Sequence, residues 1–132
     1  MKNIDQIAQY TINHEWIRKD APFYTIGMSD FGQTCFKEIE RADLPRVGQY
    51  FNKGDVFCVL ESSKAANEVE MPISGTILQI NHQLQQTPDL INQDCYGAGW
   101  LVKIVPRNLK EIEGLLSADR YREEIGVFFR KI

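Results

Sequence analysis

The sequence has few cysteines, no excess of positive charge and no long hydrophobic run, and each absence excludes a class of protein. Three cysteines form neither an even disulfide set nor a C-x-x-C pair, which favours a reducing compartment. Lys plus Arg number 15 against 18 for Asp plus Glu, a net charge of −3, so the basic excess of a nucleic-acid-binding protein is missing. No apolar stretch approaches the roughly 20 residues that cross a bilayer. We therefore expect neither nucleic-acid nor membrane binding.

The first ten residues carry no export or import signal. They have no continuous apolar core, no small-residue cleavage site and no Arg-rich, acid-poor composition. For a bacterial protein this predicts a cytoplasmic location. The mitochondrial matrix is expected only if a presequence has been removed.

The motifs of enzymes that act alone are also missing. There is no G-x-x-x-x-G-K-[ST] and no G-x-S-x-G, and Glu61 stands three residues before Lys64 where an S-x-x-K pair would need serine. The two histidines, His14 and His82, have no metal-ligand spacing with the cysteines. We therefore expect no catalytic residue and no metal site, and a protein that presents a chemical group to others.

Hydrophobic patterning predicts a small β domain with a helical end. The length of 132 residues fits a single domain spanning residues 1–132. Residues 10–18 and 23–26 have the composition of a hairpin, and Ser29 or Asp30 can cap a short helix after it. Residues 55–61 alternate, which places Val56, Cys58 and Leu60 on one face of a sandwich or flattened-barrel strand. Helical spacing begins at Leu109.

One lysine stands out by its surroundings. Lys64 lies in a short loop between two alternating segments, and its neighbours Ser62, Ser63, Ala65 and Ala66 are small. A lysine at the tip of a tight hairpin projects its amine away from the sheet, and small flanking residues leave that amine accessible. Since a lysine amine is mostly protonated at neutral pH, its acylation needs a separate enzyme and an activated donor. The alternative is an ordinary solvated lysine.

Residues 59–69, VLESSKAANEV, followed by PISGTI at residues 72–77, closely resemble the attachment hairpin of the glycine cleavage system H protein family. That family typically reads E-S-x-K-A and then P-x-S-G. Four further segments match its pattern in the same order, at residues 10–16, 26–33, 43–48 and 90–101. The resemblance covers residues 10–121, and several ordered motifs over that length are far more specific than any one of them.

The resemblance implies a mainly β, lipoyl-type sandwich hybrid (a flattened barrel) with a few short helices and a C-terminal helical tail. It implies lipoic acid in amide linkage on Lys64, with Glu61, Ser62, Ser63 and Ala65 forming the attachment hairpin. The implied function is the lipoyl-bearing carrier of the glycine cleavage system. This carrier takes an aminomethyl group from glycine decarboxylase, which uses pyridoxal phosphate, to a tetrahydrofolate-dependent aminomethyltransferase. A FAD-containing dihydrolipoyl dehydrogenase reoxidises the dithiol, and a lipoate ligase or lipoyl/octanoyl transferase loads the lysine.

In this family the loaded arm can fold back into a cleft on the carrier, where a cationic amine needs carboxylate partners. Glu15 and Glu68 match the family's acidic cleft residues, and Asn13 lies nearby in sequence. The alternative is that both carboxylates are solvated strand residues. We expect His14 and Trp16, which flank Glu15, to pack and hydrogen-bond and not to ligate.

Other features are assigned structural roles or depart from the family pattern. Lys37-Glu38 replaces the usual Gly-Asp, and Glu40-Arg41-Ala42 replaces a hydrophobic V-F-V run, so contacts of this charged segment with partner enzymes are expected to differ. Phe128 and Phe129 lie past the usual family end and either form a docking patch or pack on the sandwich. Three glycines are expected at turns that need a positive φ angle: Gly75, Gly97 and Gly99.

Three other functions remain open. The chain is alternatively an H-like relay that donates lipoate to, or carries it for, 2-oxoacid dehydrogenases or other redox systems. A biotinyl carrier is disfavoured, because such hairpins place Met on both sides of the lysine where Ser63 and Ala65 stand. The last is an unmodified β-sandwich interaction module. The acidic, compact composition fits a monomer.

Overall fold

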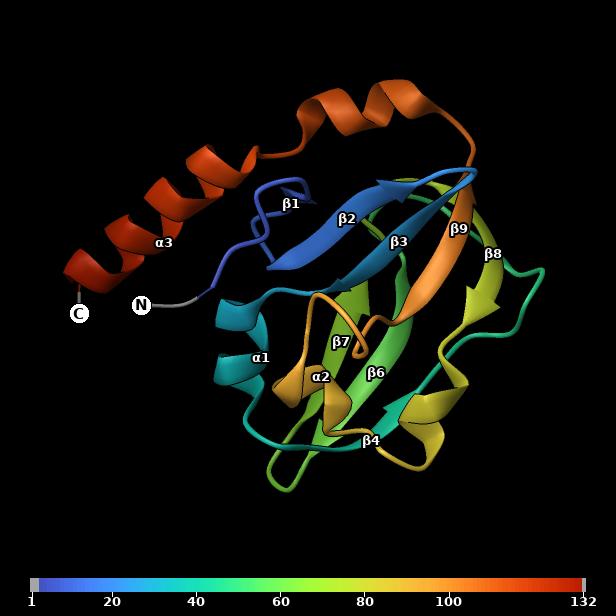
Figure 1. Cartoon of the computed structure of the whole chain (residues 1–132), viewed down its shortest axis with the longest axis horizontal. Helices are drawn as coiled ribbons and strands as arrows, with labels where there is room; N and C mark the ends of the chain where they lie inside the picture. The colour runs from blue at the N-terminus through green and yellow to red at the C-terminus, as the bar shows by residue number, and fades with distance from the viewer. Residues whose placement is uncertain (1–2, 132) are drawn as a thin grey trace.

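The computed structural model describes residues 3–131, with side chains described for residues 3–126. Its strands form two antiparallel sheets on either side of one core (Figure 1). The larger sheet has the strand order β1 (Gln9–Tyr10), β2 (Glu15–Asp20), β3 (Phe23–Met28), β9 (Val102–Pro106), β8 (Gly75–Ile80) and β5 (Tyr50–Phe51). The smaller sheet has the order β4 (Ile39–Asp43), β6 (Val56–Ser62) and β7 (Ala66–Glu70). The predicted mainly β sandwich is confirmed, as two open sheets and not as a closed barrel.

Short helices connect the strands, and a longer one follows the last strand. They are α1 (Asp30–Phe36), η1 (His82–Gln85), α2 (Leu90–Gln93), η2 (Leu109–Gly114) and α3 (Ala118–Lys131), where η marks a 3₁₀ helix. The predicted helical tail is confirmed as η2 and α3, which lie across the top and along the left side of Figure 1. No helix in the described part of the chain is both long and apolar enough to span a membrane.

Helix α1 begins with a side-chain cap and is followed by a residue in an unfavourable backbone conformation. Ser29 caps the helix, because its Oγ accepts a hydrogen bond from the Gly32 N–H at 3.0 Å, as the sequence predicts. The helix ends at Phe36, and the next residue, Lys37, has a backbone with φ 67° and ψ −163°. That region of conformational space is used almost only by glycine. The Gly-to-Lys replacement noted in the sequence therefore falls on a strained residue.

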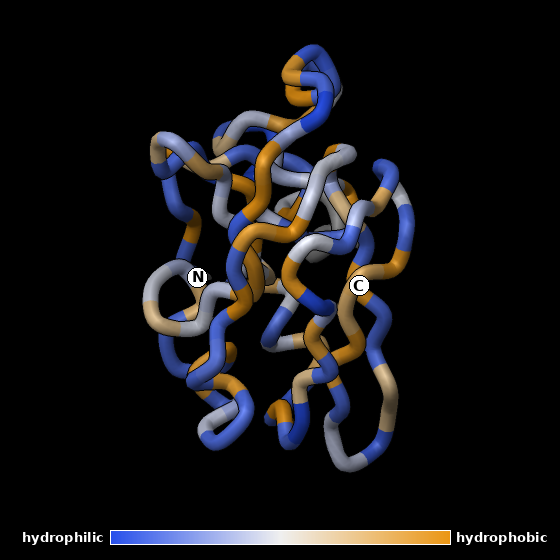
Figure 2. The backbone as a smooth tube through the Cα atoms, turned by 90° about the vertical axis from the view of Figure 1, so that its right-hand side faces the viewer, coloured by the Kyte–Doolittle hydropathy of each residue, from blue (hydrophilic) through white to orange (hydrophobic). Residues whose placement is uncertain are grey.

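The main core lies between the sheets and consists of aliphatic residues from both. Ile17, Ile26 and Ile104 come from the larger sheet, and Leu60 and Val69 from the smaller one. All but Ile26, whose neighbours Thr25 and Gly27 are also buried, lie next to a more exposed residue along the strand. Figure 2 shows short hydrophobic and hydrophilic stretches that follow one another along the chain.

A second, aromatic cluster covers one end of the outer face of the larger sheet. Tyr10 and Tyr121 stack with their ring centroids 4.2 Å apart and nearly parallel, and Trp16 and Ile125 belong to the same cluster. These contacts attach α3 to β1 and β2. The side chains of Phe128 and Phe129 lie outside the described residues.

The sequence misplaces one residue of β6. Simple alternation puts Val56 on the buried side with Cys58, but Val56 is 40% exposed and Phe57 is buried. The pairing of β6 with β7 shifts register between Val56 and Cys58. A β-bulge of this kind inserts one extra residue and therefore reverses the alternation on one side of it.

The sequence also gives the wrong reason for three glycines. Positive φ angles occur at Gly48 and Gly54, not at Gly75, Gly97 or Gly99. The backbone packs too closely at the latter three for a side chain. A Cβ on Gly75 would lie 2.7 Å from the Val105 carbonyl oxygen, and one on Gly99 would collide with the Leu90 carbonyl oxygen.

Candidate functional site

The loop that contains Lys64 is the tip of the β6–β7 hairpin. Glu61 pairs with Ala66 across the hairpin, and the Ser62 N–H donates to the Ala65 carbonyl at 2.9 Å. The Asn67 side-chain amide also donates to the Leu60 carbonyl at 3.0 Å. These bonds close the loop tightly, so the backbone pairing of β6 with β7 continues up to the tip.

The Lys64 side chain is exposed, as are Ser63, Ala65 and Ala66 beside it. Among the described residues, no carboxylate lies within ion-pair distance of its amine. The structure therefore presents an exposed primary amine at the tip of a closed hairpin, as the sequence predicts. Such an amine is open to a modifying enzyme.

One face of β7 leads from this tip to a pocket. Because alternate residues of a strand share a face, Ala66, Glu68 and Glu70 lie on one side of β7 at steps of about 7 Å. The intervening Val69 is buried in the core. An extended chain attached at the tip can follow this face past two carboxylates.

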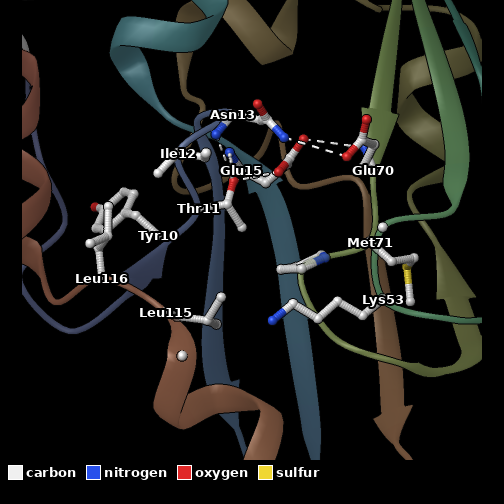
Figure 3. Close-up of a pocket in the computed structure, with 13 residues that line it drawn as sticks. Tyr10, Thr11, Ile12, Asn13, Glu15, Lys53, Glu70, Met71, Leu115 and Leu116 are labelled. Carbon is white, nitrogen blue, oxygen red and sulfur yellow. Dashed lines mark hydrogen bonds between the residues drawn. The ribbon is translucent and has the colours of Figure 1, made fainter.

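The pocket has a volume of about 290 Å³ and lies where the end of β7, the start of β2 and the segment after η2 meet. Its polar groups are unevenly distributed. In Figure 3 the carboxylates of Glu15 and Glu70 lie together with the Asn13 amide, and the Lys53 amine lies apart from them near Leu115. The remaining wall is largely apolar and includes Tyr10, Ile12, Met71, Pro72 and Leu116.

Glu15 is a buried carboxylate without a cationic partner. Its side chain accepts hydrogen bonds from the Thr11 hydroxyl at 2.5 Å and from the Glu70 N–H at 3.2 Å, and the residue is 2% exposed. Burial raises the pKa of the Glu15 carboxyl, and the nearby Glu70 carboxylate raises it further, against the effect of these hydrogen bonds. No Lys or Arg among the described residues lies within 4 Å of either carboxylate. The pair is therefore a place for an incoming cation.

A tight turn presents Asn13 and Glu15 to the pocket. The Thr11 N–H donates to the Glu15 carbonyl at 3.0 Å, and His14 takes a positive φ of 74° within the turn. The His14 ring points the other way, with its Nδ1 2.7 Å from the Tyr121 hydroxyl. Burial lowers the pKa of His14. The expectation that His14 packs and hydrogen-bonds agrees with these contacts.

Of the three cleft residues that the sequence singled out, the structure places two in the pocket and one outside it. Asn13 and Glu15 both line the pocket, and the Asn13 amide lies 3.4 Å from the Glu70 carboxylate. Glu68 is exposed and lies outside the lining. Glu70 and Lys53 were not singled out from the sequence. Strand alternation alone could have placed Glu70 on the face of Glu68, but only the fold brings it to Glu15.

The charged segment from Lys37 lies beside the hairpin. Ile39 pairs with Ser62, so the residues before Ile39 continue alongside the loop that carries Lys64. Arg41 is exposed and lies within ion-pair distance of Asp43 and Glu61 at 3.0 and 3.6 Å. The surface next to the amine is therefore polar and of mixed charge.

The described residues contain no group of three or more His, Cys, Asp or Glu side chains arranged to hold a metal ion. The three cysteines are free thiols. Cys95, in a loop, is buried, and that burial raises its pKa to about 12. This loop thiol is consequently far from reactive.

Comparison with known proteins gives a consistent result. A family model described as "Glycine cleavage H-protein" matches residues 8–127. A glycine cleavage system H protein from Alteromonas mediterranea is 40% identical over 126 residues, covering 95% of this chain and 98% of that protein. One from Halothermothrix orenii is 40% identical over 126 residues, covering 93% and 98%. The crystal structure of a glycine cleavage system H protein from Mycobacterium marinum matches with a TM-score of 0.85 and 29% identity, covering 93% of this chain and 99% of that one.

Proposed function

Because this chain belongs to the glycine cleavage H-protein family, we propose that it is the lipoyl-bearing carrier of the glycine cleavage system and that Lys64 holds the lipoyl group in amide linkage. The observation that carries the proposal is the exposed Lys64 amine, which has no ion-pair partner among the described residues and stands on a tightly closed hairpin. Glu61 closes the hairpin by pairing with Ala66, and the small side chains of Ser62, Ser63 and Ala65 leave room for a loading enzyme to reach the amine. The amine and the pocket both fit the group.

The lipoyl group supplies a dithiolane that takes up an aminomethyl group derived from glycine and passes it on. The chain itself contributes no catalytic residue in this proposal. Its partners are glycine decarboxylase with pyridoxal phosphate, aminomethyltransferase with tetrahydrofolate, and dihydrolipoyl dehydrogenase with FAD. A lipoate ligase or a lipoyl/octanoyl transferase loads Lys64. Tethering raises the effective concentration of the carried group at each active site.

We assign the pocket to the cationic end of the loaded arm. Glu15 and Glu70 provide two carboxylates in a partly dry site, where an ion pair with an ammonium group is stronger than in water. Asn13 orients the Glu70 carboxylate through its amide. Glu68 lies on the route along β7 and guides the arm without lining the pocket. Enclosure by Met71 and Leu116 limits the access of water to the carried group.

Isotope exchange tests the proposal. Purified glycine decarboxylase with the lipoylated chain should exchange labelled bicarbonate into glycine, and the Lys64→Arg variant should not. A known H protein serves as the positive control. Absence of exchange by the lipoylated chain while that control is active would reject the role in glycine cleavage.

A lipoate relay is the second candidate. It is favoured by the charged segment from Lys37 to Arg41, which lies beside the attachment hairpin because Ile39 pairs with Ser62. Transfer of lipoate from this chain to a 2-oxoacid dehydrogenase subunit by an amidotransferase would support it. The same assay with a glycine-cleavage H protein as donor provides the comparison.

We further propose that residues 1–132 act as one carrier domain, a monomer in the bacterial cytoplasm. The free thiols of all three cysteines agree with a reducing compartment. The organisms of the relatives named above are bacteria.

A further inference from the structure

The outer face of the larger sheet is covered at one end and open at the other. The aromatic cluster of Tyr10, Trp16 and Tyr121 covers β1 and β2. No such cluster lies over β5, β8 and β9 among the described residues. There Tyr50 is 40% and Val105 is 49% exposed.

These two residues form one row across three strands. Tyr50 pairs with Thr76, and Thr76 pairs with Val105. Directly paired residues share a face, so the three side chains lie side by side. Ile77 and Ile104, which follow and precede them along the strands, belong to the core, so the row faces outward.

The exposed Tyr50 ring is held in place. Its hydroxyl donates to the Asn52 side-chain oxygen at 3.0 Å and accepts from Arg107 at 3.4 Å. The Arg107 guanidinium also lies over the ring, 5.9 Å from its centroid. A side chain that is fixed before binding loses less conformational entropy when a partner arrives. Tyr and Arg are also the residue types that most often dominate binding energy at protein interfaces.

Arg107 has no carboxylate partner within 4 Å among the described residues. The nearby Glu111 carboxylate is occupied by the N–H and hydroxyl of Ser74, at 2.8 and 3.2 Å. On the same sheet, by contrast, Lys103 lies 3.8 Å from Asp20. In a chain of net charge −3, this row therefore carries, beside apolar surface, a guanidinium that makes no direct ion pair with a carboxylate among the described residues.

We propose that Tyr50, Val105 and Arg107 form a docking surface for a partner protein that presents a carboxylate next to an apolar side chain. The carboxylate pairs with Arg107, and the apolar group packs on Val105 and the Tyr50 ring. The row lies at the Pro106 end of β9, whereas the β6–β7 tip lies at the opposite end of the molecule (Figure 1). A partner bound here holds the carrier while the arm on Lys64 stays free to move.

The partner is taken to be one of the three enzymes that exchange the carried group, and to that extent this inference rests on the proposed function. Binding is measured by calorimetry with the unmodified chain against purified glycine decarboxylase, aminomethyltransferase and dihydrolipoyl dehydrogenase. Because no lipoyl group is needed, the result is independent of whether Lys64 is loaded. We expect Arg107→Glu to weaken binding to one enzyme at least tenfold, and Val105→Ser to weaken it several-fold.

Arg120→Glu is the matched control, because it makes the same charge change at an exposed position on α3. It should change affinity less than twofold. The proposal is overturned if no enzyme binds the wild-type chain, or if Arg107→Glu and Arg120→Glu behave alike. It is also overturned if sedimentation shows self-association that Arg107→Glu abolishes, because the surface would then join two copies of this chain.

Discussion

At the residue scale, the account depends on a few side chains in uncommon environments. Lys37 has a backbone conformation suited to glycine, and Glu15 is a buried carboxylate without a cation. The sequence points to both positions, because Lys37 replaces a family glycine and Glu15 matches a family cleft residue. It does not reveal the strain or the burial, since each depends on elements that meet only in the fold.

We predict that Lys37→Gly raises the free energy of unfolding by about 1 kcal/mol. Relief of an unfavourable backbone region is worth roughly 1–3 kcal/mol, and part of this is offset by the greater freedom of glycine in the unfolded chain. Urea unfolding measures the change. Lys37→Ala removes the same side chain but retains the strain, so it should give no gain. Equal stabilities of the Gly and Ala variants would argue against strain at this position.

The stability of the Glu15→Gln variant should rise relative to the wild type as the pH increases. Burial raises the pKa of Glu15 in the folded chain, so the folded state binds its proton more tightly than the unfolded state. Wild-type stability therefore falls as pH rises from the unfolded-state pKa through the folded-state pKa, and glutamine lacks this loss. Unfolding free energies measured from pH 4 to pH 8 test the prediction. A difference between the two proteins that is constant with pH would contradict it.

At the scale of elements, two contacts shape the site: α3 packs on the larger sheet, and the end of β7 meets the start of β2. Periodicity predicted the helix, the hairpin and the capping of α1, because each depends on neighbouring residues. The pairing of Ile39 with Ser62 and the meeting of Glu15 with Glu70 join distant segments. Local sequence patterns do not specify contacts between segments that are distant along the chain. They do not specify the bulge that exposes Val56 either.

Tyr121→Phe should lower the free energy of unfolding by about 1–3 kcal/mol. The ring stack with Tyr10 remains, but the hydroxyl that lies 2.7 Å from His14 Nδ1 and 2.6 Å from Ser29 Oγ is lost. The substitution should increase the rate of amide hydrogen exchange more in α3 than in β6 and β7. Tyr24→Phe is the control, since the Tyr24 hydroxyl makes no hydrogen bond to another described residue and its loss should change little. Equal effects of the two substitutions would show that the network does not anchor α3.

The carboxylates of the pocket and the exposed carboxylate of Glu68 should differ in their effect on the loaded carrier. We predict that Glu70→Gln and Glu15→Gln each speed the loss of the carried one-carbon group to water several-fold, because both remove a charge from the pocket. Glu68→Gln should have a smaller effect, since Glu68 lies outside the lining. Release of ammonia and formaldehyde from the loaded chain measures the rates. A larger effect of Glu68→Gln would relocate the binding site along the strand.

At the scale of the whole molecule, the chain separates three tasks. The hairpin tip presents an amine, the junction of the two sheets offers a pocket for a cation, and the far end of the larger sheet leaves a tyrosine–arginine pair open. The fold class and an exposed lysine at a hairpin tip were predictable, because ordered motifs such as ESSKA indicate both. The pocket's membership and the open row were not, since they arise from how two sheets and η2 pack together.

The central claim is that the Lys64 amine carries the lipoyl group, and intact-protein mass spectrometry tests it most directly. The wild-type chain and Lys64→Arg are purified from a host supplied with lipoate, and the modified peptide is identified by fragmentation. The account predicts a mass increase of one lipoyl group on the wild type, located at Lys64, and none on Lys64→Arg. A lipoyl increment that persists in Lys64→Arg, or no increment on the wild type beside a lipoylated control protein, would contradict it.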